Sequence, residues 1–369
     1  MNKKLKINVW TYLDEYNLYK KQIIDIVNKV FKSGNLILGN ELKRLEKNFS
    51  KFIKKKYAIG VNSGTDAILI GLMSLGVKKG DEVITVSNTA VPTVSAIVSA
   101  GAKPVFVDID ENDFLMDMTK LKKKITKKTK VIIPVNLYGQ SVNIKELKKI
   151  SKKLDIKILE DCAQSAGAKY FNKMSGSFGN VSAFSFYPTK NLGAYGDAGM
   201  IVTDSKKIYE KCVMLRKYGM KKLYYSELHG INSRLDEVQA GILNFKLKKL
   251  NSDIVKRRKI AKIYDIKIKN SKIILPKQNK NCHHAYYVYV IRCKKRRKLL
   301  SYLNKNNIFC NISYPFPIHL MRGYKYLNYK KGDLPVTEKL SGEILSIPMY
   351  PYLNSTKINK IIKVLNEFN

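Results

Sequence analysis

The sequence predicts an α/β protein in which a large, mostly parallel and doubly wound sheet is followed by a smaller α+β domain. Two observations support this fold class. From about residue 57, short apolar runs rich in Val and Ile alternate with segments of helix length, as in chains built from successive strand–helix–strand units. Past Pro276 this alternation stops and the pattern becomes mixed. The length of 369 residues is also enough for about two domains.

The apolar runs that we expect to be strands are bounded by Gly, Pro, Asn or Asp, as is typical of buried strands. In chain order they are Tyr57–Val61, Val83–Val86, Pro104–Val107, Val131–Val135, Ile156–Leu159, Val181–Phe186 and Met200–Thr203. Helices are expected between several of them, at Asp66–Leu75 and Ile144–Leu154. A long helix is predicted from Leu235 to about Tyr264, because apolar residues recur there at near-helical spacing.

The C-terminal part of the chain, residues 251–369, is expected to form the smaller domain. Residues 1–250 would form the large domain, including an N-terminal arm, with the boundary near residues 250–275. In the smaller domain, strands are predicted at Ala285–Ile291 and Ile308–Ser313, and helices at Arg297–Asn306, Leu334–Ser346 and Thr356–Phe368.

The formal net charge of +40, from 69 basic and 29 acidic residues, raises the question of nucleic-acid binding. Almost all of the excess is Lys, whereas proteins that read bases favour Arg for its bidentate hydrogen bonds. The lysines are also spread along the whole chain. We therefore interpret them as a solvated surface that attracts anionic small molecules toward a cleft, and we expect no nucleic-acid partner.

Targeting signals and metal motifs are also not expected. The basic segment Met1–Trp10 is not followed by an apolar stretch, which argues against a signal peptide, and no run of about 18 apolar residues predicts a membrane span. The five cysteines are scattered and form no C-x-x-C pair, which is typical of a reduced cytoplasmic protein. Cys282, His283 and His284 are adjacent, but they lack a spaced partner ligand, so we expect no metal there.

Ligands of open α/β sheets bind outside the carboxyl ends of the strands, so the residues that follow each strand are the candidates for a site. After Tyr57–Val61, the residues Gly64, Thr65 and Asp66 lie at the start of a predicted helix. Gly64 permits an unusual backbone angle, and Thr65 or Asp66 can cap the helix, whose free N–H groups suit phosphate. This segment is not a P-loop, because Val77 stands where that motif requires Lys.

Two acidic residues, Glu160 and Asp161, follow the strand Ile156–Leu159. A carboxylate buried at a strand end is costly unless a cation accompanies it. Two interpretations are open at this point. Asp161 caps the next turn, or it pairs with a protonated heterocycle.

Lys190 is isolated in an otherwise lysine-rich chain. Between Met174 and Thr203 the only charged residues are Lys190 and Asp197. A desolvated lysine has a lowered pKa and becomes a nucleophilic amine, as Schiff-base chemistry requires, although a surface lysine with its stem along apolar groups is the alternative. Together the three sites suggest a ligand with a phosphate, a cationic ring nitrogen and an aldehyde, which is pyridoxal phosphate.

At these positions the chain resembles the DegT/DnrJ/EryC1/StrS family of sugar aminotransferases, which are fold-type I enzymes dependent on pyridoxal phosphate. The resemblance covers nearly the whole chain. The matching stretches are Asn62–Ala67, Gly80–Ile84, Ala102–Asp110, Glu160–Ser165, Ser185–Gly199, Gly230–Glu237, Tyr314–Leu320 and Ser346–Tyr352.

The resemblance implies roles for the residues around the cofactor ring. Lys190 would form the Schiff base, and Asp161 would pair with the pyridine nitrogen. Gln164 would contact the side of the ring that carries the hydroxyl. The presence of Lys190 favours transamination, because the sugar dehydratases of this family carry His at that position. Ala90 stands where many relatives place an aromatic residue that stacks on the ring, so what covers that face is open.

The resemblance also implies a phosphate site, a dimer and a substrate site. The backbone around Gly64, Thr65 and Asp66 and the hydroxyl of Ser185 would hold the cofactor phosphate. Asn232 would reach the phosphate of the neighbouring subunit, because the family forms homodimers with shared active sites. The residues expected on the nucleotide-sugar side are Tyr187, Arg234, Tyr314 and His319.

The reaction implied by the resemblance moves an amino group from an amino acid, expected to be L-glutamate, to a nucleotide-linked keto-sugar. The tract Tyr314–Leu320 resembles relatives that act at C3 of dTDP-linked 6-deoxy-keto-hexoses, which favours that substrate class. Two alternatives remain. One is amination at C4 of a UDP-linked keto-sugar, and the other is a regulatory relative that binds the cofactor without catalysis.

Overall fold

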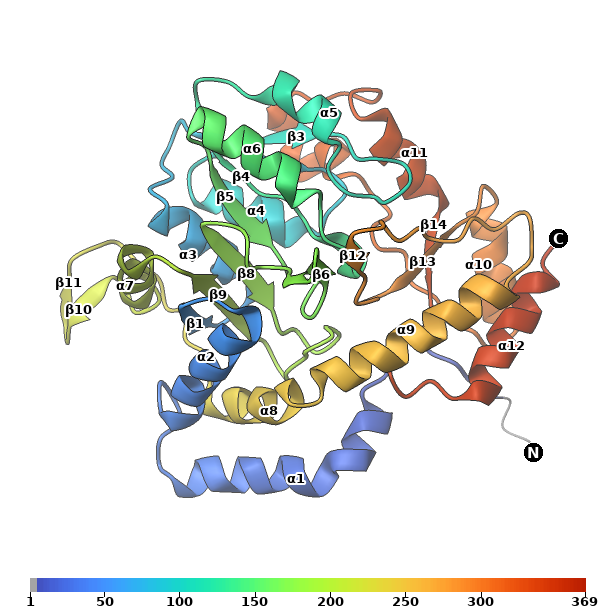
Figure 1. The fold of residues 1–369 in the computed structure, drawn as a ribbon, viewed down its shortest axis with the longest axis horizontal. Coiled ribbons are helices and arrows are strands. Elements are labelled where there is room, and N and C mark those ends of the chain that lie inside the picture. Colours follow the sequence, from blue (N-terminus) through green and yellow to red (C-terminus); the bar gives the residue numbers. More distant parts are fainter. Residues whose placement is uncertain (1–4) are drawn as a thin grey trace.

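The computed structural model describes residues 5–369, and its largest element is a seven-stranded sheet (Figure 1). The strands are β1 (Tyr57–Val61), β2 (Glu82–Val86), β3 (Lys103–Val107), β4 (Thr129–Ile132), β5 (Lys157–Asp161), β8 (Val181–Ser185) and β9 (Gly199–Thr203). Their order across the sheet is β1-β9-β8-β5-β4-β2-β3. β9 runs antiparallel to both of its neighbours, and the other pairs are parallel. The predicted mostly parallel α/β sheet is confirmed.

Helices cover both faces of this sheet. Because successive side chains of a strand point to opposite faces, Ile59 and Val61 of β1 pack with one group of helices, and Ala58 packs with the other. The first group is α3 (Gly64–Ser74), α4 (Val91–Ser99) and α7 (Lys206–Leu215). The second group is α2 (Asn40–Ile53), α6 (Ile144–Leu154) and α8 (Glu237–Leu247). The sheet is thereby packed between two layers of helices, with an apolar cluster on each face.

Several short helical turns and strands lie in the connections between the larger elements. They are the helical turns α5 (Met118–Leu121), η1 (Lys122–Lys124) and η2 (Leu137–Gly139), the strands β6 (Lys169–Tyr170), β7 (Lys173–Met174) and β12 (Cys282–His283), and the hairpin of β10 (Met220–Lys222) with β11 (Tyr225–Ser226). Strand β12 pairs with β6, so the later part of the chain contacts the loops that follow β5. The β10–β11 hairpin projects from the end of the molecule opposite to the C-terminus (Figure 1).

The later part of the chain has its own hydrophobic cluster, to which the N-terminal segment contributes Ile7. Its elements are α9 (Leu250–Lys267), β13 (Tyr289–Arg292), α10 (Arg296–Lys305), η3 (Ile318–Leu320), η4 (Arg322–Leu327), α11 (Pro335–Glu343), β14 (Ile344–Ile347) and α12 (Ser355–Asn366). Other residues of this part, such as Leu340 and Ile344, pack instead with the large sheet. The division into domains at residue 250 stays a prediction.

Four sequence predictions for helices and strands are wrong in detail. The single helix expected from Leu235 to Tyr264 is two helices, α8 and α9. The break lies where the Lys249 N–H donates to the Lys246 carbonyl, three residues back instead of the four of an α-helix. The strand expected at Ile308–Ser313 makes only isolated bridges.

The helix expected over Leu334–Ser346 ends at Glu343, and the apolar residues Ile344–Ile347 form strand β14 against β13. The strand expected from Ala285 begins at Tyr289, because β14 supplies partners only for Tyr289–Arg292. The periodicity of a short apolar run does not show whether the run is a strand or part of a helix. This ambiguity explains why the predicted ends of the helix and the strand were wrong.

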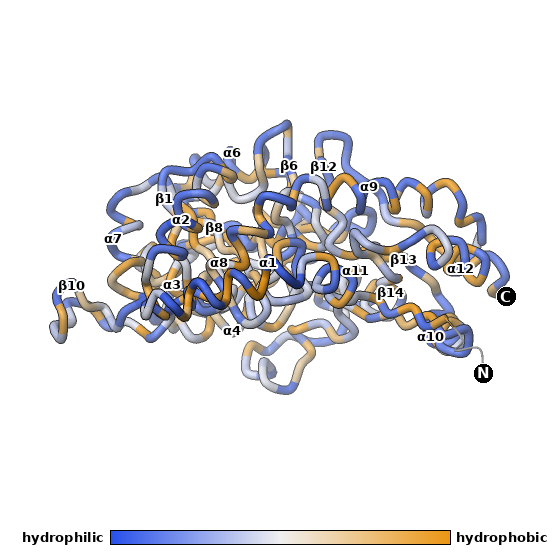
Figure 2. The backbone as a smooth tube through the Cα atoms, turned by 90° about the horizontal axis from the view of Figure 1, so that it is seen from below, coloured by the Kyte–Doolittle hydropathy of each residue, from blue (hydrophilic) through white to orange (hydrophobic). Residues whose placement is uncertain are grey.

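Helix α1 (Leu13–Lys32) lies along one side of the molecule beneath α8 (Figure 1) and leaves apolar side chains uncovered. Polar and apolar residues alternate along it (Figure 2). Leu18 and Phe31 are 57% and 60% exposed, and Ile24 is also exposed. Exposed apolar faces of this kind are typical of surfaces that interact with another molecule.

No helix within residues 5–369 is both long enough and apolar enough to cross a membrane.

Candidate active site

A cavity of about 380 Å³ opens at the carboxyl ends of β1, β5 and β8. It brings together most of the residues that the sequence singled out. Those in its wall are Gly64, Thr65, Asp161, Gln164, Ser185, Tyr187, Lys190 and Tyr314. Strand ends of a parallel sheet meet at one edge, so residues far apart in the sequence converge here.

Lys190 lies in the turn after β8, where its N–H donates to the Tyr187 carbonyl at 2.8 Å. Its Nζ lies 4.5 Å from the ring centre of Tyr287, an arrangement in which the ring face attracts the ammonium group. The Tyr287 hydroxyl and Thr189 Oγ1 are 3.0 Å apart, so the tyrosine is tied to the residue before the lysine. The amine is therefore held at the cavity wall and not in bulk solvent.

Asp161 ends β5 and is buried, with 4% of its surface exposed. Its Oδ1 accepts from the Ala163 N–H at 3.0 Å, and its Oδ2 accepts from Thr93 Oγ1 at 2.8 Å. Burial raises the pKa of Asp161 above its ordinary value, although these hydrogen bonds and the charge of Lys190 oppose the effect. A cation in the cavity beside this carboxylate would therefore stabilise its ionised form.

The start of helix α3 forms the end of the cavity that suits an anion. The helix cap is Ser63, whose Oγ accepts from the Asp66 N–H at 3.1 Å, and not Thr65 or Asp66, the two candidates from the sequence. Gly64 follows the cap and closely approaches the end of β8, because a Cβ on Gly64 would lie 2.6 Å from the Cβ of Ser185. Only glycine lets the helix N-terminus and Ser185 meet at this distance, and a helix N-terminus beside a hydroxyl is a phosphate site.

Gln164 and Tyr314 connect the cavity to the later part of the chain. Gln164 Oε1 accepts from the Tyr138 N–H at 2.8 Å, and Gln164 Nε2 donates to the Tyr314 hydroxyl at 2.8 Å. Burial raises the pKa of Tyr314, so its hydroxyl stays protonated and able to donate. The Tyr138 hydroxyl in turn donates to the Ser313 carbonyl.

Four expected site residues lie outside the cavity wall. Asp66 Oδ2 accepts from Ser233 Oγ at 2.7 Å, which links the α3 N-terminus to the segment that carries Asn232 and Arg234. Asn232 is exposed, and its backbone pairs with Lys217 at the base of the β10–β11 hairpin. His319 is buried away from the cavity. The roles given to these residues stay predictions.

The cavity wall also contains residues that the sequence reasoning missed, notably Thr93, Asp197 and Tyr287. Thr93 could not be predicted from the strand ends, because it lies within helix α4 and reaches Asp161 from there. Asp197 had a signal, as the second charged residue of the charge-poor stretch around Lys190. Tyr287 had no signal in the sequence, because it reaches the site from the part of the chain that was expected to form the smaller domain.

The wall residues fit pyridoxal phosphate. The Gly64–Ser185 approach leaves a cradle that a side chain would fill, and it lies at a helix N-terminus suited to the phosphate. Asp161 is a buried carboxyl in the cavity wall, and a protonated ring nitrogen would supply the cation that keeps it ionised. Lys190 supplies the amine that the aldehyde group needs. Ala90 is also in the wall and leaves space where a larger side chain would protrude.

Comparison with known families agrees with this geometry. The model of the DegT/DnrJ/EryC1/StrS aminotransferase family matches residues 17–366. The chain belongs to this family. The family match confirms the resemblance that the sequence indicated for this aminotransferase, together with the expected cofactor, pyridoxal phosphate.

Two relatives of this aminotransferase illustrate the range of names in the family. A dTDP-3-amino-3,4,6-trideoxy-alpha-D-glucose transaminase from Micromonospora megalomicea subsp. nigra is 43% identical over 366 residues, covering 97% of this chain and 98% of the relative. A protein of Geobacillus stearothermophilus named pleiotropic regulatory protein is 40% identical and covers 96% of both chains.

Solved structures confirm the fold-type I architecture of the aminotransferase. DesV of S. venezuelae, solved in complex with a ketimine intermediate, superposes with a TM-score of 0.95 at 33% identity, covering 98% of both chains. The protein ntda of Bacillus subtilis, solved with bound cofactor PMP, gives a TM-score of 0.90 at 28% identity, covering 99% of this chain and 85% of the other.

Proposed function

We propose that this aminotransferase moves an amino group from an amino acid, L-glutamate, to a nucleotide-linked keto-sugar. The observation that carries the proposal is the meeting of Lys190, Asp161 and the α3 N-terminus in one cavity. The names of relatives such as the Micromonospora transaminase support the sugar substrate. Bound pyridoxal phosphate would supply the electron-accepting ring and the carbonyl group that this chemistry uses.

In the proposed reaction the chain's own residues bind the cofactor, orient its ring and move protons. The N-terminus of α3 and Ser185 would hold the phosphate and so position the ring. Asp161 would accept a hydrogen bond from the protonated ring nitrogen, and Thr93 keeps the Asp161 carboxylate in place. Lys190 Nζ would move a proton from the carbon that bears the donor's amino group to the cofactor carbon, and in the second half of the reaction from the cofactor carbon to the sugar carbon that receives the amino group.

The substrate side of the proposal is C3 of a dTDP-linked 6-deoxy-keto-hexose. The sequence tract Tyr314–Leu320 and the name of the 43% identical relative favour it. Tyr314 and the half-exposed Tyr187 stand at the cavity wall, where a sugar entering from solvent would meet them. The strongly basic surface would attract the diphosphate to the cleft.

Two further candidates are tested with the same protein. C4 amination of a UDP-linked keto-sugar predicts turnover only with UDP substrates and a different product isomer. A regulatory role without catalysis, for which the Geobacillus relative's name is the supporting observation, predicts cofactor binding without turnover. Purified enzyme is therefore incubated with L-glutamate and a panel of dTDP- and UDP-linked 3-keto and 4-keto sugars. Mass spectrometry and NMR of the products distinguish the three candidates.

We also propose that the enzyme acts as a homodimer with shared active sites. Asn232 is exposed and outside the chain's own cavity, as expected for a residue that serves the partner's site. The uncovered apolar residues of α1 are consistent with a surface buried between two copies. Sedimentation analysis checks the dimer. Asn232→Ala should weaken cofactor binding without dissociating the dimer, and monomeric active enzyme would contradict the proposal.

Lys190→Ala is the direct test of the chemistry. Wild-type protein supplied with pyridoxal phosphate should show the visible absorbance of bound cofactor linked to lysine, and the variant should lose that band and its activity. Lys206→Ala, on an exposed turn of α7, is the control and should keep both. Wild-type protein that binds no pyridoxal phosphate would overturn the proposed function.

A further inference from the structure

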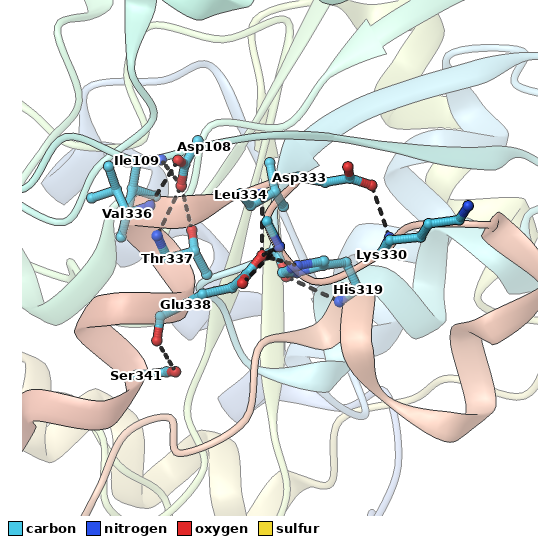
Figure 3. Close-up of polar contacts among 12 residues, drawn as sticks. Asp108, Ile109, His319, Lys330, Asp333, Leu334, Val336, Thr337, Glu338 and Ser341 are labelled. Atoms are coloured by element: carbon cyan, nitrogen blue, oxygen red, sulfur yellow. Dashed lines mark hydrogen bonds and ion pairs between the residues drawn. The ribbon is translucent and has the colours of Figure 1, made fainter.

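A row of buried and partly buried polar side chains joins helix α11 to the loop Ser87–Ala90, which connects β2 to α4. Glu338 Oε1 lies 3.1 Å from His319 Nε2, and His319 Nδ1 lies 2.8 Å from Ser87 Oγ. The side chain of His319 is 0% exposed, so protein groups and not solvent satisfy both ring nitrogens. Figure 3 shows Glu338 reaching from α11 toward the His319 ring.

One tautomer of His319 satisfies every partner in this row. Ser87 Oγ accepts from the backbone N–H of His319 at 3.0 Å, which leaves its own hydrogen for His319 Nδ1. In the tautomer that carries its hydrogen on Nε2, Nδ1 accepts from Ser87 and Nε2 donates to Glu338. Burial opposes charge on Glu338, but hydrogen bonds from Gly332, the His319 ring and Leu334 outweigh it and hold the pKa of this carboxyl below its ordinary value.

The Glu338 end of this row is rigid. Asp108, directly after β3, accepts from the N–H groups of Val336 at 3.0 Å and Thr337 at 2.9 Å, which attaches the first turn of α11 to the central sheet (Figure 3). Glu338 also accepts from the Gly332 N–H at 2.9 Å. The carboxylate that binds His319 is therefore fixed relative to the sheet.

The Ser87 end leads to the cofactor cavity. Thr89 and Ala90, in the same loop as Ser87, line the cavity. Thr89 Oγ1 lies 2.9 Å from Thr93 Oγ1, and Thr93 Oγ1 donates to Asp161. Since Thr93 uses its hydrogen on Asp161, Thr89 is the donor to Thr93. A displacement of the loop at Ser87 would therefore change both the cavity wall and the hydrogen bonds of Asp161.

We propose that His319 and Glu338 are positioning residues, which hold the Ser87–Ala90 loop and, through Thr89 and Thr93, the carboxylate of Asp161 in the orientation that the cofactor ring requires. The proposal rests on the proposed function, because it assigns Asp161 to the ring nitrogen. It also replaces substrate contact, the role expected for His319 from the sequence, by an action from outside the cavity.

Two substitutions of the histidine separate the ends of the row. In His319→Asn the side-chain oxygen can stand in for Nδ1 and accept from Ser87, whereas in His319→Gln the amide nitrogen can stand in for Nε2 and donate to Glu338. The matched control is His284→Gln, because His284 is also buried, with 5% exposure, and accepts from the Tyr286 N–H outside this row. Each protein is stripped of cofactor and titrated with pyridoxal phosphate while its visible spectrum is recorded.

The expected result is that His319→Gln weakens cofactor binding by about tenfold, as for one lost buried hydrogen bond, and shifts the pH dependence of the cofactor's visible band. His319→Asn should stay within about threefold of wild type, and His284→Gln should bind normally even if its melting temperature falls. If His319→Gln does not purify, Ser87→Ala removes the same side-chain contact, together with the acceptor of the His319 N–H, and should weaken cofactor binding at least as much.

The opposite pattern would overturn the proposal. Normal cofactor affinity and spectrum in His319→Gln and Ser87→Ala, with a raised KM for the sugar in His319→Gln, would place His319 on the substrate. Equal weakening by His284→Gln would reduce the effect to a loss of general stability. Failure of the wild-type protein to bind pyridoxal phosphate is a different result, which defeats the proposed function itself.

Discussion

The contact between Thr93 and Asp161 gives the sharpest quantitative prediction. Thr93→Val keeps the shape of the side chain but removes the 2.8 Å hydrogen bond to Oδ2, which favours the ionised carboxylate. A hydrogen bond to a charged group contributes about 1.5–3 kcal/mol, and about 1.4 kcal/mol corresponds to one pH unit. Because the cofactor needs the ionised form, the pH below which cofactor binding weakens should move upward by about 1 to 2 pH units.

The assay is a titration of cofactor-free protein with pyridoxal phosphate between pH 5 and 9, about the range in which such proteins stay folded. Thr85→Val is the matched control, because Thr85 is equally buried on β2 but donates to the Ile133 carbonyl at 3.0 Å. It should cost stability without moving the midpoint. An unchanged midpoint in Thr93→Val, or the same displacement in Thr85→Val, would refute the reasoning.

Two further predictions concern the phosphate cradle and the buried charge. Gly64→Ala places a Cβ 2.6 Å from that of Ser185 and 3.1 Å from its backbone, so cofactor affinity should fall by more than tenfold, whereas Gly323→Ala, with open space around it, should bind normally in the same titration. Asp161→Asn should raise the stability of the cofactor-free protein at pH 7, because a carboxyl whose folded-state pKa is raised loses stability as the pH rises from its ordinary value of 3.8 through the folded-state pKa. Denaturant unfolding at pH 4 and pH 7 checks the second prediction; a less stable variant at pH 7, or an equal gain at pH 4, would contradict it.

The sheet could be predicted from the sequence because each of its strands is a buried apolar run with a clear boundary. Strand β5 illustrates this: Ile158 and Leu159 are almost wholly buried, and the acidic pair at its end stops the apolar pattern. The later part of the chain was harder. Whether Ile344–Ile347 continues α11 or forms a strand depends on Tyr289–Arg292, its partner far away in the sequence, and local periodicity does not contain that information.

The candidate site divides in the same way. Lys190 and Asp161 could be found because Asp161 ends a strand and Lys190 lies in the turn after one, and strand ends converge by topology. Thr93 and Tyr287 reach the cavity through tertiary packing. Arg257, for example, is buried in α9 and donates to the backbone carbonyls of Tyr286 and Tyr287, which positions the tyrosine next to Lys190. Such contacts have no local sequence signal.

The antiparallel placement of β9 has a consequence for the lysine. Ser185 at the end of β8 pairs with Gly199 at the start of β9, so the segment that carries Lys190 leaves the sheet edge and returns to it beside its own starting point. A closed loop anchored at both ends has far fewer conformations than a free connection. The conformational entropy that must be lost to position the Lys190 amine is therefore lost once, when the chain folds, and not again in each turnover. Lengthening this loop by even a few flexible residues should leave the sheet intact while slowing the chemistry.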